Sequence, residues 1–272
     1  MNNFLSNWSN LQQRVLVAII GVAIFAGLLF SGPSGSLFLF TGIIFLCMLE
    51  FCSLSPIPYS GPEKMLASLA ACLAFGILVF SDYFNLALGA LLVLPLGLMI
   101  QVVFSAGEKP FEKAGWTMLG WVYLSLPWYC LMAMLKNLPH EPMLFLGLFG
   151  LLWMADSGAY FAGRSIGRTK LMPSVSPKKT WEGLGGGLLA SVALAWILSA
   201  YLTQFTRNEW LMLAASTTLF GTLGDLAESR LKRSLVLKDS GSLLPGHGGF
   251  LDRFDGFFLA APVNYLLVEF VF

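Results

Sequence analysis

Charge is scarce in this 272-residue chain: only 11% of the residues are Asp, Glu, Lys or Arg, whereas 57% are hydrophobic. That balance, with a mean hydropathy of +0.75, excludes an ordinary soluble domain and indicates a polytopic membrane protein. The formal net charge is only +1, and the chain has no basic tail or arm. Binding to nucleic acids is therefore disfavoured.

Cysteine and histidine are also sparse, with four and two residues. The cysteines lie in apolar surroundings without the CxxC spacing of a metal site, so we expect no function for Cys47, Cys52, Cys72 and Cys130. Internal repeats, low-complexity tracts and soluble domains are absent as well. These absences predict one compact all-α helical bundle.

Nine segments are apolar and long enough to cross the hydrocarbon core, which takes about 20 residues in a helix. They begin at Val15, Leu37, Met65, Leu86, Gly115, Met143, Gly183, Glu209 and Asp252. The run from Val15 to Phe30 could pass for a signal-peptide core, but further hydrophobic segments follow, which favours an uncleaved span. The segment from Met65 is short, and the one from Gly183 opens with glycines.

The distribution of basic residues supports nine spans with a cytoplasmic N-terminus, because cytoplasmic loops collect Lys and Arg. With this topology 14 basic residues face the cytoplasm, and only Lys136 and Arg207 face outward. The cytoplasmic set is Arg14, Lys64, Lys109, Lys113, Arg164, Arg168, Lys170, Lys178, Lys179, Arg230, Lys232, Arg233, Lys238 and Arg253. The charged loops are therefore expected to meet cytosolic solutes.

Charge is also unevenly distributed along the chain. Of the 31 charged residues, 19 fall between Asp156 and Asp255, several of them inside or against apolar segments. Charge at membrane depth is costly and usually marks a functional site. We therefore expect residues 1–105 to form a scaffold of membrane spans and residues 106–272 to form the catalytic region with its cytoplasmic loops.

Acidic residues occur in two pairs in this region. Asp225 and Glu228 are three residues apart at the end of the eighth span, and Asp252 and Asp255 have the same spacing where the ninth is expected to begin. That spacing places each pair on one helix face. Glu228 alone suits a surface salt bridge with Lys232, and Asp252 alone suits a helix cap. Together the acids offer hard oxygen ligands, which favours magnesium over zinc.

Two loops add cations and glycines. Between the acidic pairs, Lys232, Arg233 and Lys238 precede the LPGHGGF segment, whose Gly246, Gly248, Gly249 and His247 suit contact with phosphate. Between spans six and seven, the SPKKTWEG segment places hydroxyls and lysines before a helix start, which favours anions. These residues are Ser176, Lys178, Lys179 and Thr180. An ordinary basic cytoplasmic loop is the alternative interpretation of the lysines alone.

Inside span six, Asp156 is followed by Ser157 and Tyr160. A carboxylate within an apolar helix is a candidate functional group, although its role is open between metal, arginine and nucleotide contact. Carboxylates, cations and a glycine loop in an apolar enclosure together indicate phosphoryl or nucleotidyl transfer at a membrane surface.

The segment SRLKRSLVLKDSGSLLPGHGGFLDRFD, from Ser229 to Asp255, resembles the signature of phosphatidate cytidylyltransferases, the CDP-diacylglycerol synthases. GDLAES, SPKKTWEG and DSGAY also resemble motifs of this family, so the resemblance covers roughly the C-terminal 120 residues. It implies that CTP and phosphatidate give CDP-diacylglycerol and pyrophosphate in a magnesium-dependent reaction. A site for two cations is expected, with the identity of the second left open.

The resemblance also implies roles for single residues. The expected metal ligands are Asp225 and Asp252, then Asp255 and Glu228. The expected catalytic residues are Asp225, Asp252, Asp255, His247 and Lys238, with His247 orienting the attacking phosphate. Substrate binding is expected of Ser176, Lys178, Lys179, Thr180, Lys232, Arg233, Gly248, Gly249, Arg253 and Asp156.

Other functions are weighed against this one. A CTP-dependent kinase of a lipid alcohol such as a polyisoprenol would use similar residues. A transporter would spread its charges over both halves of the chain, which this sequence does not. The expected partners are CTP, phosphatidic acid and membrane lipids, whereas homodimer formation is left open. The short chain without a tail suggests a bacterial inner membrane, and the basic loops on one side suggest an active site that faces the cytoplasm.

Overall fold

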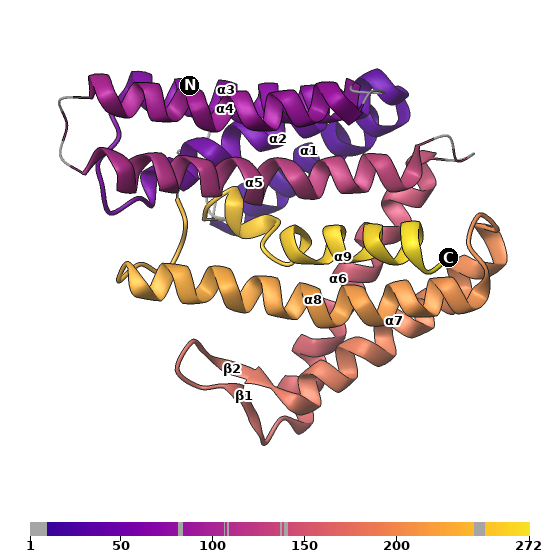
Figure 1. Ribbon diagram of the computed structural model, residues 1–272. Helices are drawn as coiled ribbons and strands as arrows, with labels where there is room; N and C mark the ends of the chain where they lie inside the picture. Colours follow the sequence, from indigo (N-terminus) through magenta and orange to yellow (C-terminus); the bar gives the residue numbers. More distant parts are fainter. Residues whose placement is uncertain are drawn as a thin grey trace. The chain divides into compact units, whose positions relative to one another are not determined.

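The computed structural model describes residues 10–80, 84–105, 107, 109–136, 138, 141–241 and 248–272. The chain divides into two compact units, residues 1–125 with 237–253 and residues 126–236 with 254–272. The described helices are α1 (Asn10–Phe30), α2 (Pro33–Ser53), α3 (Gly61–Phe80), α4 (Phe84–Phe104), α5 (Pro110–Leu135), α6 (Glu141–Ile166), α7 (Trp181–Tyr201), α8 (Arg207–Ser234) and α9 (Phe257–Phe270), with a 3-10 turn at Leu251–Arg253 (Figure 1). The predicted all-α architecture is confirmed for the described residues. The functional division near residue 105 stays a prediction.

Five of the described helices, α2, α3, α5, α6 and α7, are long and apolar enough to cross a membrane. Shorter apolar stretches lie in α1, α4 and α9. The chain is therefore an integral membrane protein, whereas nine spans and a cytoplasmic N-terminus stay predictions. The two weakest predicted segments, in α3 and α7, are among the five.

In the first unit, side chains of α5 donate hydrogen bonds to backbone carbonyls of α3. Trp121 Nε1 donates to the carbonyl of Ala67 at 3.0 Å, and Ser125 Oγ donates to that of Ala71 at 3.0 Å. The donors and acceptors are each four residues apart, so they recur on one face of each helix. This register holds α5 against α3 in an apolar environment.

In the second unit, glycines bring α6 and α7 together. A Cβ on Gly187 would lie 2.6 Å from the carbonyl oxygen of Ala155, and one on Gly158 would lie 2.6 Å from Cβ of Ala190. Small residues let membrane helices approach closely and gain packing contacts. The glycines that open the seventh span therefore serve helix packing.

A hairpin of two antiparallel strands, β1 (Lys170–Met172) and β2 (Ser176–Thr180), joins α6 to α7 (Figure 1). Its base is closed where Trp181 N donates to the carbonyl of Thr169 at 3.0 Å, and the Glu182 carboxylate accepts from Thr169 N. Thr180 ends β2 and caps α7, because its hydroxyl accepts from Gly183 N at 3.1 Å. The sequence predicted a plain loop here.

The start of the ninth helix differs from the prediction. Asp252 lies in the 3-10 turn, Asp255 lies in the turn that follows, and α9 begins only at Phe257. The expectation that both acids stand on one helix face was therefore wrong. Gly256 ends the turn, and its backbone N–H donates to the Asp255 carboxylate at 2.6 Å.

Candidate functional site

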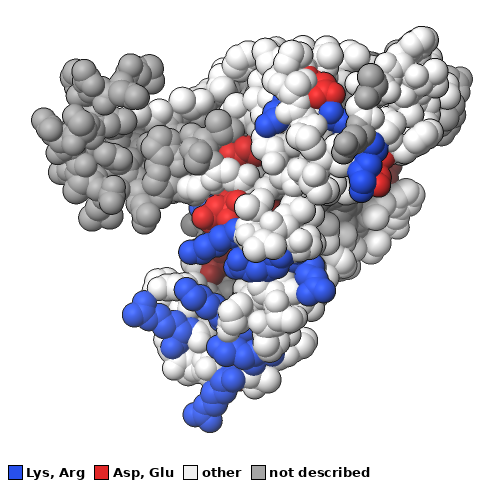
Figure 2. Space-filling model, turned by 90° about the vertical axis from the view of Figure 1, so that its left-hand side faces the viewer, with Lys and Arg blue, Asp and Glu red and all other residues white. Residues whose placement is uncertain are grey.

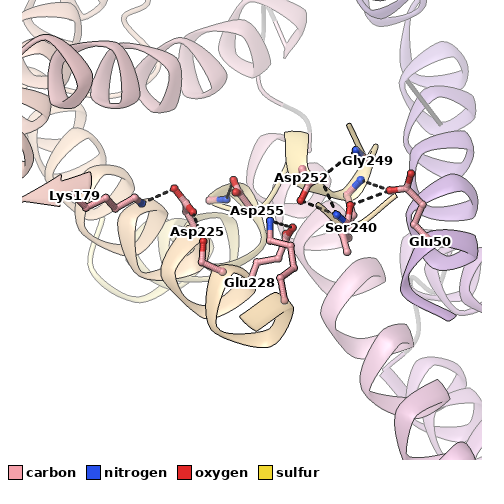
Figure 3. Close-up of polar contacts among 12 residues, drawn as sticks. Glu50, Lys179, Asp225, Glu228, Ser240, Gly249, Asp252 and Asp255 are labelled. Atoms are coloured by element: carbon pink, nitrogen blue, oxygen red, sulfur yellow. Dashed lines mark hydrogen bonds and ion pairs between the residues drawn. The ribbon is translucent and has the colours of Figure 1, made fainter. Parts of the chain in front are cut away.

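Asp225 is the centre of a polar cluster in the second unit (Figure 3). It lies near the C-terminal end of α8, and its carboxylate forms an ion pair with Lys179 of β2. Its other oxygen accepts a hydrogen bond from the Ser229 hydroxyl at 3.1 Å. The basic partner of Asp225 therefore comes from the hairpin, which its own helix sequence could not indicate.

Glycines bring the turn before α9 against α8. A Cβ on Gly224 would lie 2.5 Å from the carbonyl oxygen of Asp255, and one on Gly256 would lie 3.0 Å from that of Gly221. No side chain therefore separates the two backbones at these points. This close approach places Asp255 beside Asp225.

The two carboxylates influence each other electrostatically. The pKa of Asp255 is raised from 3.8 to about 7, chiefly by burial and next by the negative charge of Asp225, while Lys232 acts in the opposite direction. Two acids held together in this way suit a shared cation, because a cation would relieve their repulsion and accept hard oxygen ligands.

Glu228 lies one turn beyond Asp225 and is buried. Its Oε1 pairs with Lys232 Nζ at 3.1 Å, and Lys232 is itself only 8% exposed. The structure thus contains the salt bridge that the sequence offered as the alternative to metal binding. A buried lysine held by a carboxylate keeps a fixed direction, which suits contact with a phosphate.

Asp156 lies on α6 of the same unit, where Lys179 and Asp225 are within electrostatic reach. One turn further, Tyr160 accepts a hydrogen bond from Arg164 Nη1 at 2.8 Å. Asp156 therefore belongs to the same charged environment as Asp225. Whether Asp156 contacts metal, an arginine or nucleotide stays open, as the sequence left it.

Basic side chains gather on the face that carries the hairpin and the end of α8 (Figure 2). Lys178 is exposed on β2, next to the partly buried Lys179, and Arg233 is exposed at the end of α8. Ser176 is partly exposed at the start of β2. Thr180 is only 4% exposed, and its hydroxyl caps α7, so its described role is structural.

Asp252 has a separate set of partners in the first unit (Figure 3). Its carboxylate accepts hydrogen bonds from Ser240 N and Gly249 N, each at 3.0 Å to Oδ2. These donors belong to residues 240–251, the glycine-rich segment before it, so Asp252 does not cap α9. Because Asp225 and Asp252 belong to different units, a cation shared by both stays a prediction.

The glycine-rich segment is described at its two ends. Lys238 and Arg253, which flank it, are exposed, and Gly248 has a φ of 80°, a conformation that favours glycine. At Gly249 a Cβ would lie 1.8 Å from Ser240 Oγ. His247 and Gly246 lie outside the described residues.

Two features were missed by the sequence analysis. Glu50 of α2 accepts hydrogen bonds from Ser240 Oγ and Leu251 N, and the carboxylate within an apolar segment was a signal that could have identified it. A cavity of about 390 Å³ lies between α3, α4 and α5 and is lined by Tyr59, Glu63 and Lys113. None of the predicted site residues that the structure describes lines it. No group of three His, Cys, Asp or Glu side chains in the described part of the chain is arranged to hold a metal ion.

Comparison with known proteins shows what the chain resembles along its whole length. A phosphatidate cytidylyltransferase of Staphylococcus haemolyticus is 34% identical over 264 residues, which cover 95% of this chain and 100% of the relative. Those of Staphylococcus saprophyticus and Staphylococcus aureus are 34% and 31% identical over 269 and 268 residues, with the same coverage. A model described as the cytidylyltransferase family matches residues 12–271. The chain therefore belongs to the cytidylyltransferase family.

Proposed function

We propose that this chain transfers the cytidylyl group of CTP to phosphatidate, giving CDP-diacylglycerol and pyrophosphate. The observation that carries the proposal is the similarity, over 95% of the chain, to relatives named phosphatidate cytidylyltransferase. In this reaction a phosphatidate oxygen forms a bond to the α-phosphorus of CTP, and the bond from that phosphorus to the β-phosphate oxygen breaks. The integral membrane character of the chain suits a lipid acceptor.

Magnesium is the cation that the acids would hold. Asp225 and Asp255 fit it, because their oxygens are hard ligands and their charges repel each other where they stand. Asp252 would be a further ligand, and we assign Glu228 chiefly to holding Lys232. When bound, magnesium neutralises charge that develops on the phosphates. A second cation of unassigned identity is part of the proposal.

The chain's own cations would bind and orient the nucleotide. Lys179 holds the Asp225 carboxylate in one direction, and Lys232 is held by Glu228. The exposed side chains Lys178, Arg233 and Lys238 are placed to bind phosphate oxygens. We assign binding of phosphate oxygens also to Ser176, Arg253 and the backbone of Gly248 and Gly249. Arg253 would in addition neutralise the leaving pyrophosphate. His247 would orient the lipid phosphate.

The active site is proposed to face the cytoplasm, where CTP is present. The excess of basic residues on one side of the nine-span topology supports this orientation. The bacterial sources of the relatives support placement in a bacterial inner membrane. Whether the enzyme acts as a homodimer is open to measurement of its mass in detergent.

The test is an assay of purified protein in detergent with CTP, phosphatidate and magnesium. We expect pyrophosphate release that depends on phosphatidate and is lost in Asp252→Asn. A polyisoprenol in place of phosphatidate should give no turnover. Phosphorylation of that alcohol, with no pyrophosphate from phosphatidate, would instead identify a CTP-dependent lipid-alcohol kinase.

A further inference from the structure

Glu50 is a buried carboxylate in the last turn of α2. It lies on α2, one of the five helices apolar enough to span a membrane, and is only 4% exposed. A carboxylate in such a place is costly unless hydrogen bonds compensate for its lost hydration. Its partners therefore indicate what it stabilises.

The described partners of Glu50 belong to one segment, residues 240–251, and lie at its two ends. Glu50 Oε2 accepts from Leu251 N at 2.8 Å and from Ser240 Oγ at 3.2 Å (Figure 3). A Cβ on Gly241 would lie 2.5 Å from Glu50 Oε1, so the backbone there lies against the carboxylate. Glu50 thus holds both ends of the glycine-rich segment at one point.

Ser240 connects this anchor to Asp252. Its hydroxyl donates to Glu50, while its backbone N–H donates to Asp252 Oδ2 at 3.0 Å. Gly249 N donates to the same oxygen of Asp252 at 3.0 Å. Ser240 is therefore held by Glu50 through its hydroxyl, and it holds Asp252 through its backbone N–H. The direction of the Asp252 carboxylate thus depends on where Glu50 keeps Ser240.

We infer that Glu50 is a positioning residue, which holds Ser240 and Leu251 together and thereby directs the Asp252 carboxylate. A carboxylate oxygen can accept two hydrogen bonds at once, so Glu50 Oε2 can hold Ser240 and Leu251 together. The effect of Glu50 on turnover rests on the proposed function, whereas its effect on the segment does not.

The primary test is hydrogen exchange of the metal-free, nucleotide-free protein in detergent. In Glu50→Ala, the amides of Ser240, Gly249 and Leu251 should exchange about tenfold faster or more, while the α6 and α7 amides keep wild-type rates. Glu50→Gln keeps an acceptor oxygen and should recover most of the protection. The matched control is Glu112→Ala, which removes an acid of the same unit whose side chain is 58% exposed. It should leave the exchange rates of the segment unchanged.

Kinetics then test the consequence for Asp252. Glu50→Ala should lower kcat about tenfold or more and raise the magnesium concentration needed for half-maximal rate, with KM for phosphatidate unchanged. Unchanged exchange in the segment, faster exchange throughout the chain, or Glu50→Gln no better than Glu50→Ala would overturn the inference. Faster exchange confined to the segment, in a protein that never turns over CTP, would support the anchor and refute the proposed function.

Discussion

Lys179 and Asp225 form an ion pair whose contribution to catalysis can be measured by removing one residue. A hydrogen bond to a charged group contributes about 1.5–3 kcal/mol, so Lys179→Ala should lower kcat/KM for CTP by about tenfold to hundredfold. Lys170→Ala removes the same charge from an exposed position on β1 of the same hairpin and should stay within about twofold. Steady-state kinetics of both variants provide the measurement. Equal losses would show that only net charge matters.

Asp255 provides a pH-dependent prediction at the same scale. Because its pKa is raised from 3.8 to about 7, the folded protein binds a proton that the unfolded chain has lost between those values. In a chelator, the free energy of unfolding contributed by this group therefore falls as pH rises from about 4 to about 7.

The variant Asp255→Asn lacks this titration. At pH 8 without divalent cations it should unfold at a higher temperature than the wild-type protein, and the difference should vanish near pH 4. Added magnesium should stabilise the wild-type protein more than the variant. Thermal unfolding in detergent measures all three comparisons, and a variant less stable than the wild-type protein at pH 8 would contradict the expected sign.

Helix packing in the second unit depends on glycines that can be tested in pairs. Gly187→Ala puts a Cβ about 2.6 Å from the Ala155 carbonyl oxygen, so α6 and α7 must separate. Overpacking of this kind costs about 1–3 kcal/mol. Gly185→Ala lies on the same helix with nothing within 4 Å of its Cβ and should be neutral or slightly stabilising. Thermal unfolding of the two variants compares them, and equal stabilities would show that α6 and α7 are not closely packed there.

At the scale of elements, apolar length predicts the helices well. The helices α5, α6 and α8 contain the segments predicted from Gly115, Met143 and Glu209. In lipid a long hydrophobic run must satisfy its backbone hydrogen bonds within itself, and a helix does so. The hairpin was not predicted, since its pairing of Lys170 with Thr180 has no hydrophobic pattern. The spacing of Asp252 and Asp255 also fits one face of a helix, so the sequence alone predicts helix where the structure has a turn.

At the scale of the whole molecule, sequence patterns identify residue types but not long-range pairs. Asp225 and Asp255 were identified from charge in an apolar chain, but the contact of Lys179 with Asp225 required the fold. Glu50 and Ser240 are 190 residues apart, and no local pattern connects them. The candidate site was thus largely predictable in composition, whereas its internal hydrogen bonds were not.

The topology gives a prediction for the whole chain in the membrane. Lys170→Cys is predicted on the cytoplasmic side and should react with a membrane-impermeant thiol reagent only in inverted vesicles. Arg207→Cys is predicted on the outer side and should react only in intact cells whose outer layers let the reagent through. The native cysteines Cys47, Cys52 and Cys130 are buried and should contribute little background. Labelling of both variants from the same side would contradict the proposed orientation.

The contact of Gly224 with the turn at Asp255 has a consequence for inhibitor resistance. The surface where Gly224 meets this turn consists of backbone atoms, so a change of one side chain cannot alter it without disturbing the site. Even an added methyl group at Gly224 would displace Asp255. A compound that rests on Gly221, Gly224 and Gly256 would therefore leave the cell few escape mutations that preserve the enzyme. Selection against such a compound should instead yield changes in uptake or in gene dosage.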